Sequence, residues 1–76
     1  MVDFKMLISS IDSSGIKRGY IAERLGISRT SLWMKLNGKT EISAKQMCVL
    51  KELLKLSDTK FRRIFFATES ELKSRS

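Results

Sequence analysis

The sequence predicts an all-α fold in which short helices share one core. Apolar residues recur at spacings of three and four along most of the chain, which is the periodicity of helices with one buried face. The chain contains no proline, so no helix interior loses a backbone hydrogen bond to that residue. Its 76 residues suffice for one small domain. We place this domain at residues 1–67 and expect residues 68–76, rich in serine and charge, to form a flexible tail.

The first two helices are predicted at about residues 3–13 and 18–25. Phe4, Leu7, Ile8 and Ile11 fall on one face of the first, and the residues from Ser13 to Gly15 end it. The second helix turns Ile21, Ala22 and Leu25 inward, and Gly26 stands where a left-handed residue can stop it.

The third helix is predicted at about residues 29–36. Ser28 is a favourable N-cap, Leu32 and Leu36 anchor the inward face, and Asn37-Gly38 ends the helix. At about 100° per residue, the opposite face then carries Thr30, Trp33, Met34 and Asn37.

The fourth and fifth helices follow a loop that ends at Ile42. Ser43 and Gln46 form a capping-box pattern ahead of a helix at about 44–55, in which we expect Cys48 to be a buried or half-buried apolar residue. Ser57-Asp58 caps a short fifth helix. Its apolar residues should mostly close the core, with the last of them the most exposed, or alternatively leave a strip for a two-fold contact: Phe61, Ile64, Phe65 and Phe66.

The charge balance favours a polyanionic partner. Fifteen Lys and Arg residues against eight Asp and Glu give a net charge of +7 and a pI near 10.0. Between residues 17 and 39 the only acid is Glu23, whereas the bases are Lys17, Arg18, Arg24, Arg29, Lys35 and Lys39. The excess charge therefore concentrates around the third helix.

Several function classes lack the residues that they require. With one cysteine and no histidine, the chain can form no intramolecular disulfide and no zinc site of the usual type. We also expect no catalytic residues, no metal and no cofactor, because the sequence offers no phosphate loop and no acid–base pair. No apolar run is long enough to cross a bilayer, so we expect a protein that does not enter membranes.

The outward face of the third helix is the candidate site for reading DNA bases. Thr30, Trp33 and Met34 are placed to touch base edges or thymine methyl groups, and Arg29 at the helix tip suits bidentate bonding to guanine. Alternatively, Trp33 folds back onto the fourth helix or onto the loop after Gly38, and Arg29 is solvated or pairs with Glu23 or with a phosphate. Phosphate contacts are expected near the ends of the second and third helices, from Lys17, Arg18, Asn37, Lys39 and Thr40.

The same residues carry a resemblance to a known family. Residues 7–56 resemble the Cro and phage-repressor family, whose domains are called XRE-type helix-turn-helix domains. The resemblance rests on the run Ile21-Ala22-Glu23-Arg24-Leu25-Gly26-Ile27-Ser28-Arg29-Thr30-Ser31-Leu32 and on Leu36-Asn37-Gly38-Lys39.

This resemblance implies a compact five-helix, lambda-repressor-like fold with its helix-turn-helix in the second and third helices. It further implies a transcriptional regulator that binds double-stranded operator DNA, commonly as a homodimer, in the cytoplasm and nucleoid of a bacterial host. The segment from Arg62 to Ala67 is similar to small phage-encoded regulators, which favours a phage or prophage origin.

The chain departs from the family pattern at two places. Lys17-Arg18-Gly19 replaces the usual Ser-Gln start of the second helix, which removes a cap and adds a glycine that costs up to about 1 kcal/mol against alanine. Trp33 stands where smaller residues are usual. The alternative function is therefore a modulator or antirepressor that binds a second regulator protein through Trp33 or through Phe61, Ile64, Phe65 and Phe66.

Overall fold

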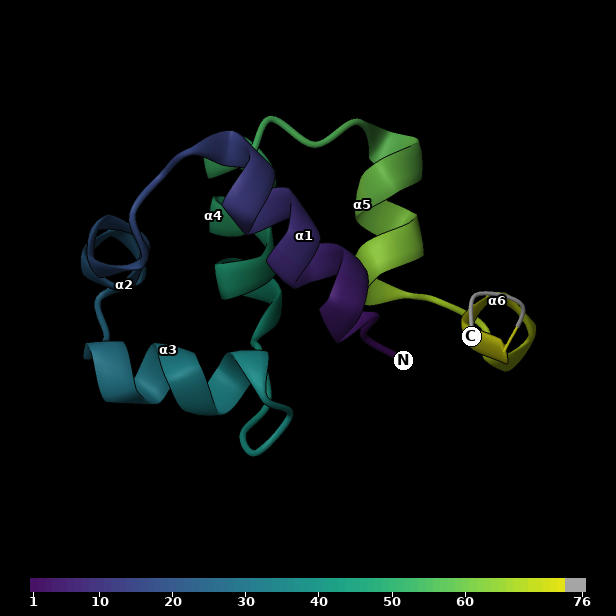
Figure 1. Cartoon of the computed structure of the whole chain (residues 1–76), viewed down its shortest axis with the longest axis horizontal. Coiled ribbons are helices and arrows are strands. Elements are labelled where there is room, and N and C mark those ends of the chain that lie inside the picture. The colour runs from purple at the N-terminus through teal and green to yellow at the C-terminus, as the bar shows by residue number, and fades with distance from the viewer. Residues whose placement is uncertain (74–76) are drawn as a thin grey trace.

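Six α-helices form the regular secondary structure of residues 1–73, which are the residues that this computed structural model describes (Figure 1). They are α1 (Phe4–Ser14), α2 (Arg18–Leu25), α3 (Arg29–Leu36), α4 (Ala44–Leu53), α5 (Asp58–Phe65) and α6 (Glu69–Lys73). The all-α prediction is confirmed, and the predicted bounds of the first four helices lie within two residues of these. The expected number of five helices is one too low.

Side-chain caps explain why most of the helices begin where they do. The Ser28 hydroxyl accepts a hydrogen bond from the Ser31 amide at 3.0 Å, and the predicted capping box of Ser43 and Gln46 is complete. Such caps contribute typically about 1 kcal/mol each. Asp3 and Ser57 cap α1 and α5 in the same way. Helix α2 differs, because Lys17 offers it no side-chain cap.

The additional helix α6 begins with a capping box of its own. The Thr68 amide donates to the Glu71 carboxylate at 2.9 Å, and the Glu71 amide donates to the Thr68 hydroxyl at 3.1 Å. The Thr68 amide, and then its hydroxyl, lower the pKa of Glu71 from its ordinary value. Arg63 in α5 also pairs with Glu71 at 3.8 Å. The predicted tail thus starts with a helical turn, its flexibility stays a prediction, and residues 74–76 lie outside the described residues.

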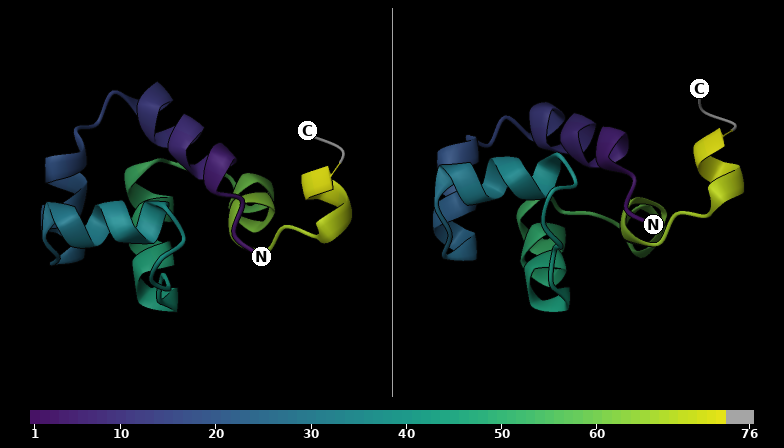
Figure 2. Two further views of the ribbon diagram at one scale, coloured as in Figure 1. Left: turned by 60° about the horizontal axis from the view of Figure 1, so that its bottom comes forward. Right: turned by 90° about the horizontal axis from the view of Figure 1, so that it is seen from below.

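The core lies where α1 meets α3 and α5 and where α2 meets α3 and α4 (Figure 2). Each of the first five helices contributes to it, and Ile42 from the loop before α4 closes it. The buried apolar residues of this cluster are Leu7, Ile11, Ile21, Ala22, Leu32, Leu36, Ile42, Leu50, Ile64 and Phe65. The radius of gyration of 11.8 Å is close to the roughly 11 Å expected of a compact domain of this length.

The first residues of the chain pair with the end of α5. The Ala67 amide donates to the Met1 carbonyl at 2.8 Å, and the Asp3 amide donates to the Ile64 carbonyl at 2.6 Å. These bonds hold the start of α1 against α5. Helix α6, in contrast, stands apart from the body of the molecule in all the ribbon views (Figures 1 and 2).

Helix α4 differs from the prediction at two positions. Cys48 is exposed, so the expectation of a buried or half-buried residue is wrong. Leu50 turns inward, and a residue two positions earlier lies about 200° away on the helix surface. The helix ends at Leu53 because Lys55 adopts a left-handed conformation with φ of 51°. None of the helices in residues 1–73 is long and apolar enough to cross a membrane.

Candidate functional site

Helix α3 presents one face to solvent while its other face is anchored in the core. Leu32 and Leu36 are each only 2% exposed, whereas Trp33 is 52% exposed. Thr30 is also exposed, and Met34 is half-buried. The orientation agrees with the helical periodicity of the sequence, and the role of these residues as base readers stays a prediction.

A hollow of about 570 Å³ lies between the start of α2 and helix α3. It brings most of the predicted base-reading residues together with two of the predicted phosphate ligands, and no acidic residue lines it. The lining residues are Lys17, Arg18, Gly19, Arg29, Thr30, Leu32, Trp33 and Leu36. Three cationic side chains therefore face a hollow with a tryptophan wall, which is a setting that attracts anions.

The guanidinium of Arg29 lies directly against Gly19. A methyl group on Gly19 would come within 2.6 Å of an Arg29 terminal nitrogen, so only the missing side chain allows this approach. Arg29 makes no ion pair with Glu23, and its guanidinium makes no ion pair or hydrogen bond with any of residues 1–73. Its hydrogen-bond donors thus remain available at the mouth of the hollow.

The start of α2 adds to this positive potential. The Tyr20 and Ile21 amides bond to the Lys17 carbonyl, whereas the Arg18 and Gly19 amides have no partner among the described residues. Free amides at a helix start carry a partial positive charge. Arg18 pairs with Asp12 at 3.3 Å, with both side chains largely exposed. A surface pair of this kind contributes little stability, so Arg18 can exchange Asp12 for another anion.

The remaining predicted phosphate ligands lie at the far end of α3. Asn37 is the C-cap of that helix, and its side-chain amide donates to the Trp33 carbonyl at 2.8 Å. The Lys39 ammonium lies 6.0 Å from the centre of the Trp33 ring. Thr40 is exposed in the loop that follows. The structure therefore separates the predicted phosphate ligands into two groups, one at each end of α3.

Most residues of the second predicted protein interface, on α5, are not exposed at the surface. Ile64 and Phe65 are buried and Phe61 is half-buried, while Phe66 is 56% exposed. The exposures of these four side chains agree with the expectation that Phe66 is the most exposed of them. Phe66 and Trp33 therefore remain as the exposed aromatic residues among the predicted interface positions.

One exposed pair on α2 is absent from the sequence prediction. The Arg24 guanidinium donates to the Tyr20 hydroxyl at 3.3 Å and lies 5.9 Å from the centre of its ring. The hydrogen bond to Tyr20 is the main cause that raises the pKa of Arg24 above its ordinary value. The spacing of four residues, which places two side chains side by side on a helix, was the signal that could have revealed the pair.

No family model, no curated protein and no solved structure matches the chain. Among residues 1–73, no cluster of three or more His, Cys, Asp or Glu side chains could hold a metal ion. The function must therefore be inferred from the residues of the hollow and of the exposed face of α3.

Proposed function

We propose that the protein is a transcriptional regulator that binds double-stranded DNA in a sequence-specific manner. The observation that carries the proposal is the exposed face of α3 beside a hollow lined by Lys17, Arg18 and Arg29. A rigid helix with polar and aromatic side chains facing outward fits the major groove, which admits one α-helix. The net charge of +7 suits the phosphate backbone. The resemblance to the Cro and phage-repressor family supports the same assignment.

In the proposed complex, α2 and α3 act as a helix-turn-helix. Helix α3 enters the major groove, where Arg29 donates to a guanine and Thr30, Trp33 and Met34 contact base edges or thymine methyl groups. One phosphate lies at the start of α2, near Lys17 and Arg18. A second lies near Asn37, Lys39 and Thr40, beyond the other end of α3. Phosphate contacts at both ends of α3 would fix its register along the groove.

Fluorescence anisotropy with labelled duplexes from the DNA that flanks the gene tests this proposal. We expect one duplex to bind tightly and to lose affinity steeply as salt rises, above a weaker salt-sensitive binding to unrelated DNA. Arg29→Ala should weaken the specific complex by about 1 to 3 kcal/mol. Lys60→Ala is the matched control, because it removes one positive charge from an exposed position on α5. Equal binding to all duplexes would refute specific readout.

The exposure of Trp33 favours a second candidate function, a modulator that binds another regulator protein. Tryptophan is enriched among the residues that dominate protein interfaces, and the Trp33 side chain is half exposed. Separate Trp33→Ala and Arg29→Ala variants distinguish the candidates. A DNA reader should lose its operator affinity with Arg29→Ala, whereas a protein binder should lose its partner with Trp33→Ala and keep it with Arg29→Ala.

A further inference from the structure

The hollow between α2 and α3 has the size and the lining of a small-molecule site. Its volume of about 570 Å³ lies within the roughly 300 to 1,000 Å³ that is typical of ligand pockets. Leu32 and Leu36 line it although each is only 2% exposed, and Trp33 adds an aromatic wall. Figure 1 shows α2 above the N-terminal end of α3. Apolar side chains combined with a few polar groups are the usual lining of such a site.

The charges around the hollow favour a ligand that carries a phosphate group. Lys17, Arg18 and Arg29 line the hollow, and no acidic residue does. The side chains of Lys17 and Arg29 form no ion pair or hydrogen bond with residues 1–73. Arg18 pairs with Asp12 at 3.3 Å, and both side chains are exposed, so an anion in the hollow can take the place of Asp12. Guanidinium groups bind phosphate through paired hydrogen bonds, and a phosphate therefore matches this lining well.

The indole ring of Trp33 favours a ligand that also carries a flat aromatic ring. Trp33 is 52% exposed, and exposed aromatic side chains bind nucleobases of every type by stacking. In duplex DNA the bases stack on one another, so a helix in the groove reaches their edges and not their faces. An unstacked base can cover the face of the Trp33 ring, whereas a paired base inside a duplex cannot.

We propose that the hollow binds a free nucleoside monophosphate as a small-molecule effector. Lys17, Arg18 and Arg29 hold its phosphate. Its base stacks on Trp33. The binding itself does not rest on the proposed function, but its consequence for DNA does. The nucleotide covers Arg29 and Trp33, which the proposed DNA complex also uses, so the nucleotide and the duplex should exclude one another.

Quenching of tryptophan fluorescence measures this binding directly, because Trp33 is the only tryptophan in the chain. The probes are the monophosphates of adenosine, guanosine, cytidine and thymidine. At least one of them should quench the emission in a saturable manner, with a dissociation constant of about 10 to 300 μM. The matching nucleoside and inorganic phosphate should each bind at least about tenfold more weakly. No saturation by any monophosphate up to about 5 mM, or equally tight binding of the nucleoside or of inorganic phosphate, would overturn the inference.

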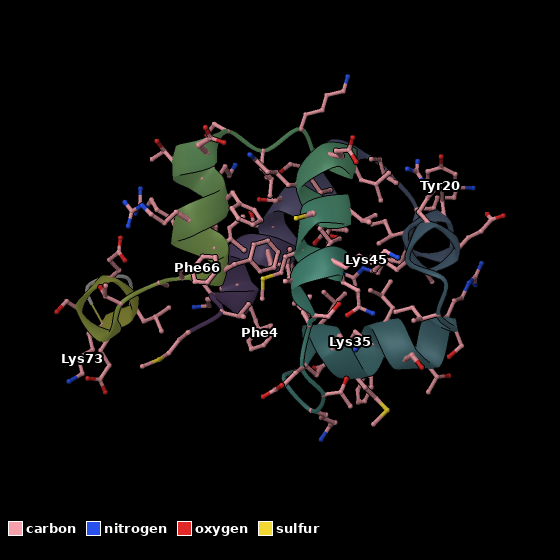
Figure 3. All side chains as sticks on the ribbon, turned by 180° about the vertical axis from the view of Figure 1, so that it is seen from behind. Phe4, Tyr20, Lys35, Lys45, Phe66 and Lys73 are labelled. Atoms are coloured by element: carbon pink, nitrogen blue, oxygen red, sulfur yellow. The ribbon has the colours of Figure 1, made fainter. Side chains whose placement is uncertain are left out.

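Variants of the full chain locate the bound nucleotide, with calorimetry in place of fluorescence. Arg29→Ala and Trp33→Leu should each weaken binding about tenfold or more. Lys60→Ala and Tyr20→Leu are the matched controls, because they remove an exposed charge on α5 and an exposed ring on α2 that do not line the hollow. Figure 3 shows Tyr20 on the side of α2 that lies away from α3. With helix content checked by circular dichroism, unchanged binding to both hollow variants would refute this site.

Competition with DNA tests the consequence for the proposed function. At ten times its dissociation constant, the monophosphate should weaken binding of the specific duplex about tenfold, measured by anisotropy at constant ionic strength. The matching nucleoside at the same concentration is the control and should leave the DNA affinity unchanged. A monophosphate that binds but does not weaken DNA binding would refute mutual exclusion. If no duplex binds specifically, the proposed function fails, and the fluorescence titration alone still decides whether the hollow binds the nucleotide.

Discussion

At the scale of single residues, Gly19 links the stability of α2 to the position of Arg29. Its φ angle is not in the left-handed region, so alanine fits the backbone. Gly19→Ala should raise the free energy of unfolding by about 0.5 to 1 kcal/mol, because glycine has low helix propensity. The new methyl group displaces the guanidinium of Arg29, so affinity for the proposed DNA operator should fall about threefold or more if the observed pose is the binding pose.

Urea unfolding and anisotropy on the same samples check this prediction. Ser9→Ala, on an exposed position of α1, is the control, because it also improves helix propensity but lies outside the hollow. A Gly19→Ala variant that is more stable and binds DNA as well as the original would show that the Arg29 pose does not matter.

The candidate site was only partly predictable at this scale. The outward position of Trp33 follows from the spacing of Leu32 and Leu36, because helical periodicity is a local property. The approach of Arg29 to Gly19 is a contact between two helices, and the placement of Lys39 over Trp33 depends on how the loop after α3 folds. Such contacts depend on tertiary packing, which no local pattern specifies.

At the scale of helices, local signals set the starts better than the ends. Ser28, Ser43 and Ser57 cap their own helices, and each was recognisable from its side chain alone. The capping box from Thr68 to Glu71 was equally visible in the sequence and reveals α6. The end of α4 carries no such signal, because a lysine rather than a glycine adopts the left-handed conformation there.

The left-handed Lys55 at the end of α4 should therefore limit stability. This conformation costs a residue with a side chain roughly 1 kcal/mol or more, and glycine adopts it without that cost. Lys55→Gly should raise the free energy of unfolding by about 0.5 to 1 kcal/mol after the larger entropy of the unfolded chain is counted. Lys45→Gly, inside the same helix, is the contrasting control and should lower stability by about 1 kcal/mol. A destabilised Lys55→Gly variant in urea unfolding would contradict the strain argument.

At the scale of the whole molecule, salt should stabilise the free protein and weaken the proposed complex with DNA. The net charge of +7 produces repulsion within the folded domain, concentrated near the hollow that holds Lys17, Arg18 and Arg29. In each of the three ion pairs found among residues 1–73 at least one of the two side chains is exposed, so screening removes little attraction. Raising NaCl from about 20 to 300 mM shortens the Debye length several-fold and should stabilise the free domain by up to about 1 kcal/mol, a rise of a few degrees in Tm.

The proposed binding to DNA uses the same positive charges, but salt should affect it in the opposite direction. Each phosphate neutralised by Lys or Arg releases counterions, so added salt lowers the affinity for the duplex. Thermal unfolding can be followed by circular dichroism with and without the duplex. The melting temperatures of the free and the DNA-bound protein should therefore approach one another as the salt concentration rises. A Tm of the free protein that falls with salt would show that ion pairs outweigh repulsion in this fold. If the difference between the melting temperatures of the free and the DNA-bound protein did not change with salt, phosphate contacts would contribute little to the complex.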